Sequence, residues 1–280
     1  MGVDIIIGGH SHTILEKPHR VNDILIAQAG VGTDQIGRFD IVVDDDTNSI
    51  IDYSWQLIPI DDNLTEPDEK LQEYIESFKD VVDRKYNTII GKLARELTHP
   101  KREEETSLGN LVADAFAEVA ESDVMLVGSG SIRSKKLGPV VTLKDLLSCF
   151  PFDDVLTRYT VSGEKLKEIF SHVMRTENRN SEGECYQVNG RVKAVYDDNA
   201  HKLVDLTIDD QSVSDTDSYT LCLQGFHFIN SDAYLNVSNE ELLELKGSKV
   251  VSTSAKEVLE EYLRNHQNIS KIVEGRLVYR

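Results

Sequence analysis

Cysteine, basic residues and long apolar runs are all scarce in this chain of 280 residues. The three cysteines, Cys149, Cys185 and Cys222, lie far apart and show no Cys-x-x-Cys spacing, so they give no sign of a zinc or dithiol redox site. We therefore expect buried free thiols. No apolar run approaches the ~20 residues that span a bilayer, and the first residues carry neither a basic n-region nor a cleavage site. No membrane span and no export signal are expected in the sequence as given, and the localisation stays open.

Positive charge is scarce as well. There are 30 Lys and Arg residues against 49 Asp and Glu, which gives a formal net charge of −19. Such a chain repels a duplex nucleic acid or an anionic membrane surface, so neither is expected as a partner. A phosphorylated ligand would need local positive charge that overcomes this global field. Because 40% of the residues are hydrophobic, the chain can bury a sizeable core and is expected to be globular.

The first sixty residues are predicted to form part of a sheet. Residues 1–9 are an apolar, β-branched run ending in two glycines, which predicts a fully buried strand of a parallel sheet. Short strands are predicted at 24–28, 37–43 and 50–58, separated by turns rich in Gly or Asp. A buried strand needs neighbours on both sides, and this material amounts to about half of a sandwich. Residues 1–60 are therefore expected to be the C-terminal portion of a domain whose larger part lies upstream.

A long helix and a second domain follow. The spacing of apolar residues predicts a helix over 66–86 with Thr65 as its N-cap, so 61–88 is expected to be a connecting segment. From 89 to 280, helices and strands succeed each other in a mixed order that favours an α+β domain. The predicted helices are 107–116, 143–148 and 163–175, and the predicted strands are 123–127, 156–161, 191–196, 203–208 and 218–223.

The sharpest local pattern is Gly8-Gly-His-Ser-His12, at the C-terminal end of the first predicted strand. Open parallel sheets bind ligands at this end. Two imidazoles one residue apart on a tight glycine turn can face two metal ions or share one. A bare His-x-His is a weak signal, and the buried strand in front of it strengthens the metal hypothesis for His10 and His12.

This motif resembles the last motif of the calcineurin-like metallophosphoesterases, Gly-His-x-His after a buried strand, and specifically of their 5'-nucleotidase branch. Further ordered matches cover most of the chain. They are Arg102–Ala115 (the signature that opens the 5'-nucleotidase C-terminal domain), Gly128–Arg133 (Gly-Gly-Gly-Ile-Arg in the family), Phe150–Asp154 (Leu-Pro-Phe-Gly-Asn), Gly183–Gly190 (Gly-Gly-Phe-x-Gln-x-x-Gly) and the closing Gly275-Arg276.

The resemblance implies an α+β chain made of three parts. These are the remnant of an α/β metallophosphoesterase sandwich, a connecting helix, and a mixed α+β 5'-nucleotidase C-terminal domain. It also implies two divalent metal ions (Mn, Zn or Co), with His10 belonging to one and His12 to the other. The family's Asp-x-His, Gly-Asp-x-x-Asp and Gly-Asn-His-Glu motifs would lie upstream of Met1, so metal binding by this chain is expected to be weak or absent.

The resemblance assigns phosphate binding to Arg133, because the family's glycine-rich loop brings its arginine to the substrate phosphate, and a guanidinium fork suits an oxyanion. Arg158 is a second candidate, and Asp154, in the matching Pro-Phe segment, is a further candidate for substrate binding. The alternative for either arginine is an ordinary surface salt bridge.

The nucleoside would be held by other residues of the same domain. In the family two aromatic rings sandwich the base, and here Phe226 supplies one while Cys185 occupies the position of the other. Asp232 is kept from the segment that grips the ribose hydroxyls, although the glycines around it are replaced, so positive φ would strain Ser231. The alternative for Phe226 is a core aromatic. His227, next to Phe226, is a candidate pocket residue, whereas His19, His99, His172, His201 and His266 are expected to be surface or structural.

The reaction implied is metal-dependent hydrolysis of nucleotide phosphate esters. This chain would supply the last metal motif and the nucleotide-binding domain, and alone it is expected to be inactive. A non-catalytic nucleotide-binding or interaction module derived from the family is the alternative. A third possibility is that Met1 is not the true start of an ordinary nucleotidase, whose full-length relatives are commonly exported. Besides a nucleotide or nucleoside, the partners considered are the missing N-terminal half and a second copy of the chain.

Overall fold

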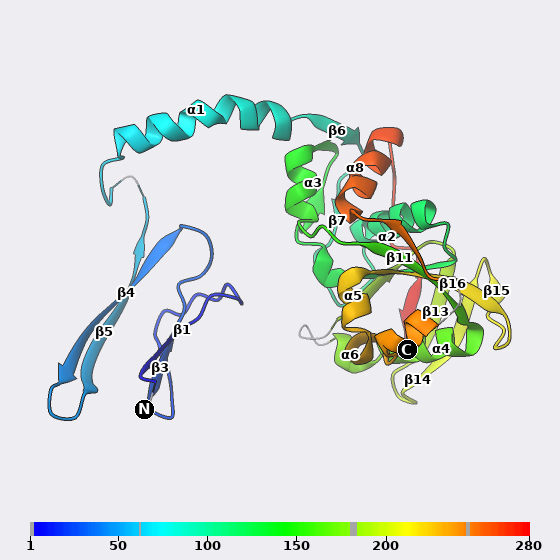
Figure 1. Ribbon diagram of the computed structural model, residues 1–280, viewed down its shortest axis with the longest axis horizontal. Coiled ribbons are helices and arrows are strands. Elements are labelled where there is room, and N and C mark those ends of the chain that lie inside the picture. The colour runs from blue at the N-terminus through cyan, green and yellow to red at the C-terminus, as the bar shows by residue number, and fades with distance from the viewer. Residues whose placement is uncertain (1–2, 62, 180–183, 245–246) are drawn as a thin grey trace. The chain divides into compact units, whose positions relative to one another are not determined.

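The computed structural model describes residues 3–61, 63–179, 184–244 and 247–280 (Figure 1). It contains two compact units, Met1–Asp80 and Val81–Arg280, and the boundary between them falls inside helix α1, Glu69–Tyr86. Within the described residues, no helix is long and apolar enough to cross a membrane.

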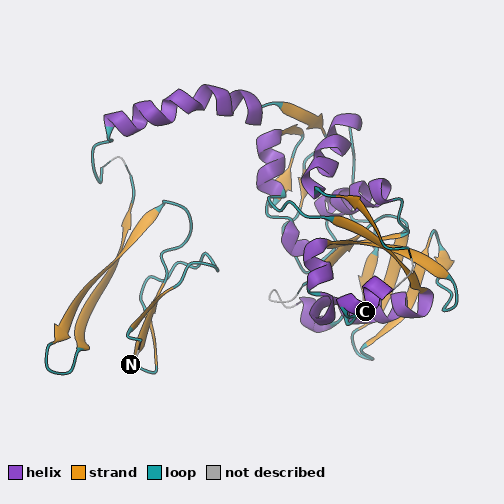
Figure 2. Ribbon diagram, in the orientation of Figure 1, coloured by secondary structure: helices purple, strands orange, loops and turns teal. Residues whose placement is uncertain are grey.

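The first unit consists of short strands and one long hairpin (Figure 2). β1 pairs in parallel with β3, β3 pairs antiparallel with β2, and β4 pairs antiparallel with β5. The strands are β1 Ile5–Ile7, β2 His19–Val21, β3 Ile24–Ala27, β4 Gln35–Asp44 and β5 Ser49–Pro59.

The parallel pairing predicted for the first strand is confirmed, but its predicted burial is wrong. Ile6 and Ile7 are 42% and 69% exposed. The reason is that β1 has a neighbour on one side, β3, among the described residues, so its apolar side chains lack the cover that a central strand receives.

Helix α1 begins three residues later than predicted. Its cap is Asp68, whose carboxylate accepts a hydrogen bond from the backbone N–H of Leu71 at 3.0 Å, so the prediction of Thr65 as N-cap is wrong. Pro67 disfavours the helical conformation of Glu66, and this delays the start until after the proline. The helix over 69–86 is otherwise confirmed.

The second unit is a mixed α+β fold built on a five-stranded sheet of order β12-β8-β16-β11-β17. β8 and β16 run parallel in its centre, and the other pairs are antiparallel. A second sheet has the order β15-β14-β13-β18, and β13 and β18 are parallel. The strands are β6 Ile89–Lys92, β7 Leu97–Thr98, β8 Val124–Gly128, β9 Lys136–Leu137, β10 Val140–Thr142, β11 Leu156–Ser162, β12 Tyr186–Val188, β13 Val192–Asp197, β14 Lys202–Ile208, β15 Gln211–Ser212, β16 Ser218–Gln224, β17 Lys249–Ser252 and β18 Leu277–Tyr279.

Helices cover both faces of the five-stranded sheet, which divides the core in two. Met125 and Val127 of β8 pack into a cluster with α2, α3 and α8, whereas Val124 and Leu126 pack into a second cluster with α4. This alternation follows from the two-residue period of a strand, and it explains why β8 is apolar at every position. The helices are α2 Ser107–Ala120, α3 Leu143–Cys149, α4 Gly163–Val173, α5 Gly225–Ile229, α6 Ser231–Leu235, α7 Asn239–Glu244 and α8 Ala255–Asn265.

The three cysteines of the second unit are free and buried, as predicted. Burial raises the pKa of Cys149, Cys185 and Cys222 to about 12, so all three are neutral thiols at physiological pH.

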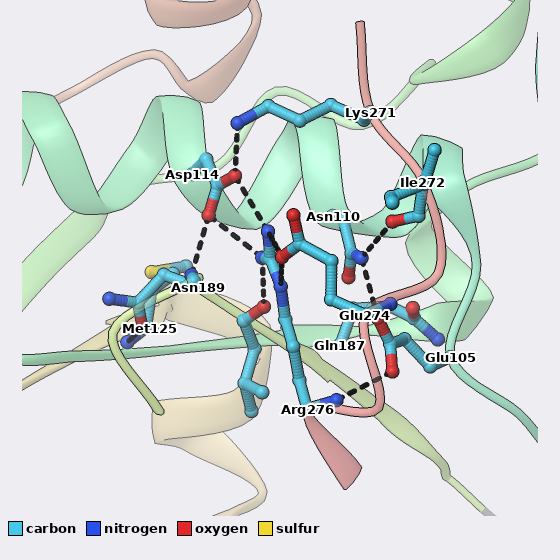
Figure 3. Close-up of polar contacts among 12 residues, drawn as sticks. Glu105, Asn110, Asp114, Met125, Gln187, Asn189, Lys271, Ile272, Glu274 and Arg276 are labelled. Atoms are coloured by element: carbon cyan, nitrogen blue, oxygen red, sulfur yellow. Dashed lines mark hydrogen bonds and ion pairs between the residues drawn. The ribbon is translucent and has the colours of Figure 1, made fainter. Parts of the chain in front are cut away.

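A buried ionic network holds the C-terminal segment against α2 (Figure 3). Arg276, 2% exposed, donates to both carboxylate oxygens of Asp114 at 2.8 and 2.9 Å and to the carbonyl of Val188 at 2.8 Å. Burial alone would raise the pKa of Asp114, but Arg276 and Lys271 hold it below its ordinary value. Glu105 accepts the backbone N–H groups of residues 274 and 276, each at 2.7 Å. The Gly275-Arg276 pair thus closes the domain by inserting a paired guanidinium into its interior.

Candidate functional site

The glycine-rich segment leaves the central strand β8 as a tight turn. Residues 129–131 form one 3-10 turn, and the backbone N–H of Arg133 then donates to the carbonyl of Cys149 at 2.7 Å. The side chain of Arg133 is exposed, and its guanidinium lies over the ring of Phe152 at 5.1 Å. Among the described residues Arg133 has no ion-pair partner. Its charge is therefore free to meet an anion.

The buried side chain of His99 contacts the backbone of this turn. His99 Nδ1 lies 2.8 Å from the hydroxyl of Thr106, and Nε2 lies 3.2 Å from the carbonyl of Ser129. Because a carbonyl can only accept, Nε2 carries the proton and Nδ1 accepts from Thr106. Burial lowers the pKa of His99, helped by the nearby charge of Arg102, which keeps the ring neutral. The expectation that His99 is structural fits this position, although its spacing in the sequence gave no sign of the partner.

Gln187 completes the support of the turn. Its amide donates to the hydroxyl of Ser129 at 2.7 Å and to the carbonyl of Glu104 at 2.9 Å, and its oxygen accepts the N–H of Thr106 at 3.0 Å. A Cβ at Gly109 would lie 2.2 Å from that oxygen, so only glycine leaves room for the amide there. The Gly109 and Gln187 positions of two separate motifs therefore meet, and together they fix the turn that carries Arg133.

Phe226 is the second residue of the short helix α5, which follows β16, and the residue is 50% exposed. Its backbone N–H donates to Asp154 Oδ2 at 2.8 Å, while Asp154 Oδ1 accepts from the N–H of Val155 at 2.9 Å. A Cβ at Gly225 would lie 2.5 Å from Asp154. Asp154, predicted to lie in the substrate site, thus fixes the backbone that presents Phe226, and the core reading of Phe226 does not fit its exposure.

Asp232 and Tyr234 lie on α6, directly after α5. The Tyr234 ring is 5.9 Å from that of Phe226, at an interplanar angle of 33°. Asp232 is exposed. The anticipated strain at Ser231 is absent, because residues 231–235 are helical and need no positive φ. This segment therefore needs no glycine to adopt its conformation.

Two predicted site residues point elsewhere. Arg158 donates to the carbonyls of Ala120 at 2.9 Å and Glu121 at 3.2 Å, and so completes the C-terminus of α2. Cys185 is buried, and its thiol lies 3.8 Å from the carbonyl of Tyr186. Gly183, which opens the segment that matched the family loop, lies outside the described residues. The structure pairs Arg133 with Phe152 and Asp154 with Phe226, whereas Arg158 and the buried Cys185 make other contacts.

The metal candidates lie in the first unit. His10 and His12 are exposed on a turn after β1, in which His12 has a φ of 57° and its N–H donates to the carbonyl of Gly9 at 3.3 Å. Gln28 donates to the hydroxyl of Ser11 at 3.0 Å and braces the turn. In the part of the chain that the structure describes, no group of three His, Cys, Asp or Glu side chains lies close enough to hold a metal ion. Two imidazoles alone do not fit a dinuclear site, which needs bridging or further anionic ligands.

Comparisons with known proteins agree with this architecture. The chain is 28% identical over 227 residues to the endonuclease YhcR of Bacillus subtilis and 28% identical over 251 residues to the trifunctional nucleotide phosphoesterase YfkN of the same organism. These alignments cover 80% and 83% of this chain but only 18% and 17% of the two relatives.

A solved structure shows the same fold. The crystal structure of a 5'-nucleotidase precursor from Thermus thermophilus superposes with a TM-score of 0.74 at 19% identity, and the match covers 100% of this chain and 60% of that one. The family described as "5'-nucleotidase, C-terminal domain" matches residues 88–238. Because this match takes in more than half of the 280 residues, the chain belongs to the 5'-nucleotidase C-terminal domain family.

Proposed function

We propose that the second unit binds a nucleotide, with Arg133 at the phosphate, Phe226 stacked on the base and Asp232 at the ribose hydroxyls. One observation carries this proposal: the half-exposed Phe226, and a guanidinium that has no ion-pair partner within the described residues, are each mounted on backbone that hydrogen bonds to Asp154 and His99 hold in place. Rigid mounting lowers the entropy lost on binding. The nucleotide phosphoesterase among the relatives supports this choice of ligand.

We also propose that His10 and His12 serve as ligands to divalent metal ions in a complete phosphoesterase centre. When bound, such ions would polarise the phosphate ester and activate water. The described residues supply two imidazoles for this task and no third ligand beside them. The 280-residue chain alone is therefore proposed to bind nucleotides without hydrolysing them, and a non-catalytic binding module remains the second candidate on the same observation.

Calorimetry with adenosine and its 5'-monophosphate tests the binding proposal. Arg133→Ala should weaken the monophosphate by about 1.5–3 kcal/mol, the scale of a charge-assisted hydrogen bond, and leave adenosine nearly unchanged. Arg158→Ala is the matched control, because it removes the same charge from the end of α2. This control should bind both ligands as the native chain does, with a lower free energy of unfolding.

Two results would contradict the proposal. If Arg133→Ala weakens adenosine and its monophosphate equally, Arg133 does not contact the phosphate. If Arg158→Ala weakens only the monophosphate, the phosphate site lies at the other arginine. Turnover of the monophosphate with added Mn, Co or Zn at an enzyme's usual ~1–10³ per second, abolished by His10→Ala, would show that the chain is catalytic alone.

A further inference from the structure

A buried histidine lies directly behind the exposed ring of Phe226. His227 is 1% exposed, and neither ring nitrogen has a hydrogen-bond partner among the described residues. Its ring meets Tyr186 at 5.1 Å and Phe226 at 5.3 Å, in both cases edge to face. The carboxylate of Glu184 is its charged neighbour, with Oε1 3.5 Å from Nε2. Buried polar atoms without hydrogen-bond partners are rare and require an explanation. His227 contacts both the Phe226 ring and the carboxylate of Glu184.

Glu184 also rests on the glycine-rich turn. A Cβ at Gly128 would lie 2.2 Å from Glu184 Oε1 and 2.4 Å from His227 Nε2, so position 128 must be glycine for both side chains to fit. At Gly130 a Cβ would lie 3.3 Å from Glu184 Oε2. The carboxylate therefore contacts both the turn that leads to Arg133 and the histidine behind Phe226. The Glu184 side chain is 18% exposed, so part of it faces solvent.

We propose that Glu184 selects the base of the bound nucleotide by accepting hydrogen bonds from adjacent N–H donors, the pattern that guanine presents. This inference rests on the proposed nucleotide binding. A carboxylate has only acceptors, and guanine places the N1–H and one N2–H side by side, where they match the two oxygens. Adenine places the acceptor N1 next to its amino group, so one carboxylate oxygen would face a lone pair.

Two features of this chain make hydrogen bonds from the base to Glu184 important for binding. Cys185 is buried and offers no second stacking face, so a base held on one face by Phe226 gains from polar contacts. The chain also has a net charge of −19, and another carboxylate next to a phosphate-binding turn disfavours an anionic ligand. Two N–H donors on the ligand offset that repulsion, whereas a base that offers a lone pair increases it.

The test compares the 5'-monophosphates of guanosine, inosine and adenosine by calorimetry on the 280-residue chain. The native chain should bind the guanosine nucleotide about tenfold or more tightly than the adenosine nucleotide, with inosine between them because it lacks the 2-amino group. Glu184→Gln should remove the preference. Glu184→Asp keeps the charge but withdraws it by one methylene, and should also reduce the preference. Glu240→Gln, at an exposed position of α7, makes the same charge change as Glu184→Gln and should leave the preference intact.

The outcomes separate this inference from the function on which it rests. Equal binding of the guanosine and adenosine nucleotides, or an unchanged preference in Glu184→Gln, overturns the role of Glu184, while the dependence on Arg133 still supports a nucleotide site. Absence of binding for all three nucleotides to the folded native chain overturns both. Circular dichroism of each variant shows that loss of preference is not loss of fold.

Discussion

Single residues in this domain act through the backbone that they hold more than through their own exposed atoms. Asp154 was predicted from a motif to contact substrate, yet its two oxygens accept backbone N–H groups from positions 155 and 226. His99 similarly fixes the carbonyl of Ser129. The His99 contact is buried, so losing it leaves an unsatisfied group as well as a displaced turn, whereas the Asp154 contacts are partly or fully exposed.

His99 makes stability depend on pH. Burial lowers its pKa in the folded chain, so as the pH falls below about 6.5 the unfolded chain takes up a proton that the folded chain resists. Its contribution to stability is therefore complete above pH 6.5 and is lost as the pH falls toward the lowered folded pKa. We expect the free energy of unfolding, measured with urea at pH 7.5 and 5.0, to fall less in His99→Gln than in the native chain.

The comparison with this variant isolates His99, because burial also lowers the pKa of His172, which remains in both proteins. Protonated His99 would in addition face Arg102, which opposes the change, while Glu103 favours it. An equal loss of stability in the native chain and His99→Gln would mean that the ring is protonated in the fold as easily as in the unfolded chain. The hydrogen-bond assignment to Thr106 would then be wrong.

At the scale of elements, helix α2 shows tertiary contact overriding helix propensity. Glycine inside a helix is ordinarily about 0.5–1 kcal/mol less stable than alanine. At Gly109, replacing glycine by alanine is expected to lower the stability instead of raising it, since the new Cβ would lie 2.2 Å from the oxygen of Gln187. Gly109→Ala should therefore destabilise the chain by about 1–3 kcal/mol, the scale of an overpacked core, in urea unfolding.

The same substitution made in the Gln187→Ala variant tests whether the clash with Gln187 is the cause of the destabilisation. In Gln187→Ala the obstructing amide is absent, so adding Gly109→Ala there should be neutral or stabilising. If Gly109→Ala costs the same in both backgrounds, the clash with Gln187 is not the reason for the glycine. The nucleotide affinity of the single Gly109→Ala variant should also fall, because Gln187 then no longer holds Ser129 in place.

The helices and strands were largely predictable from the sequence, but the contacts between them were not. Helix α4 follows from the helical spacing of its apolar residues, and strand β8 from a short continuous apolar run. The start of α1 was misplaced because two nearby residues could cap it, and the proline between them decided the outcome. The contact of His99 with Ser129 joins positions 30 residues apart, and the inward turn of Cys185 depends on packing, so local pattern carries no trace of either.

For the whole molecule, the two units differ in how much core they bury. Among the described residues, the buried hydrophobic side chains before position 81 are Leu25 and Ala27, whereas the second unit has two clusters on either side of its sheet. Local opening costs little where few apolar contacts must break. The family match likewise begins at residue 88, shortly after α1 ends.

Limited proteolysis should therefore remove the first unit before it cuts the second. Trypsin has exposed sites at Arg84 and Lys85 near the end of α1, and we expect a resistant fragment that begins near residue 87. Mass measurement of the fragment identifies its ends. Because Arg133, Glu184, Phe226 and Asp232 all lie in the second unit, the fragment should keep the nucleotide affinity of the whole chain. First cuts within 130–230 while the N-terminus stays intact would contradict this division, and a resistant fragment that no longer binds nucleotide would show that the first unit contributes to the site.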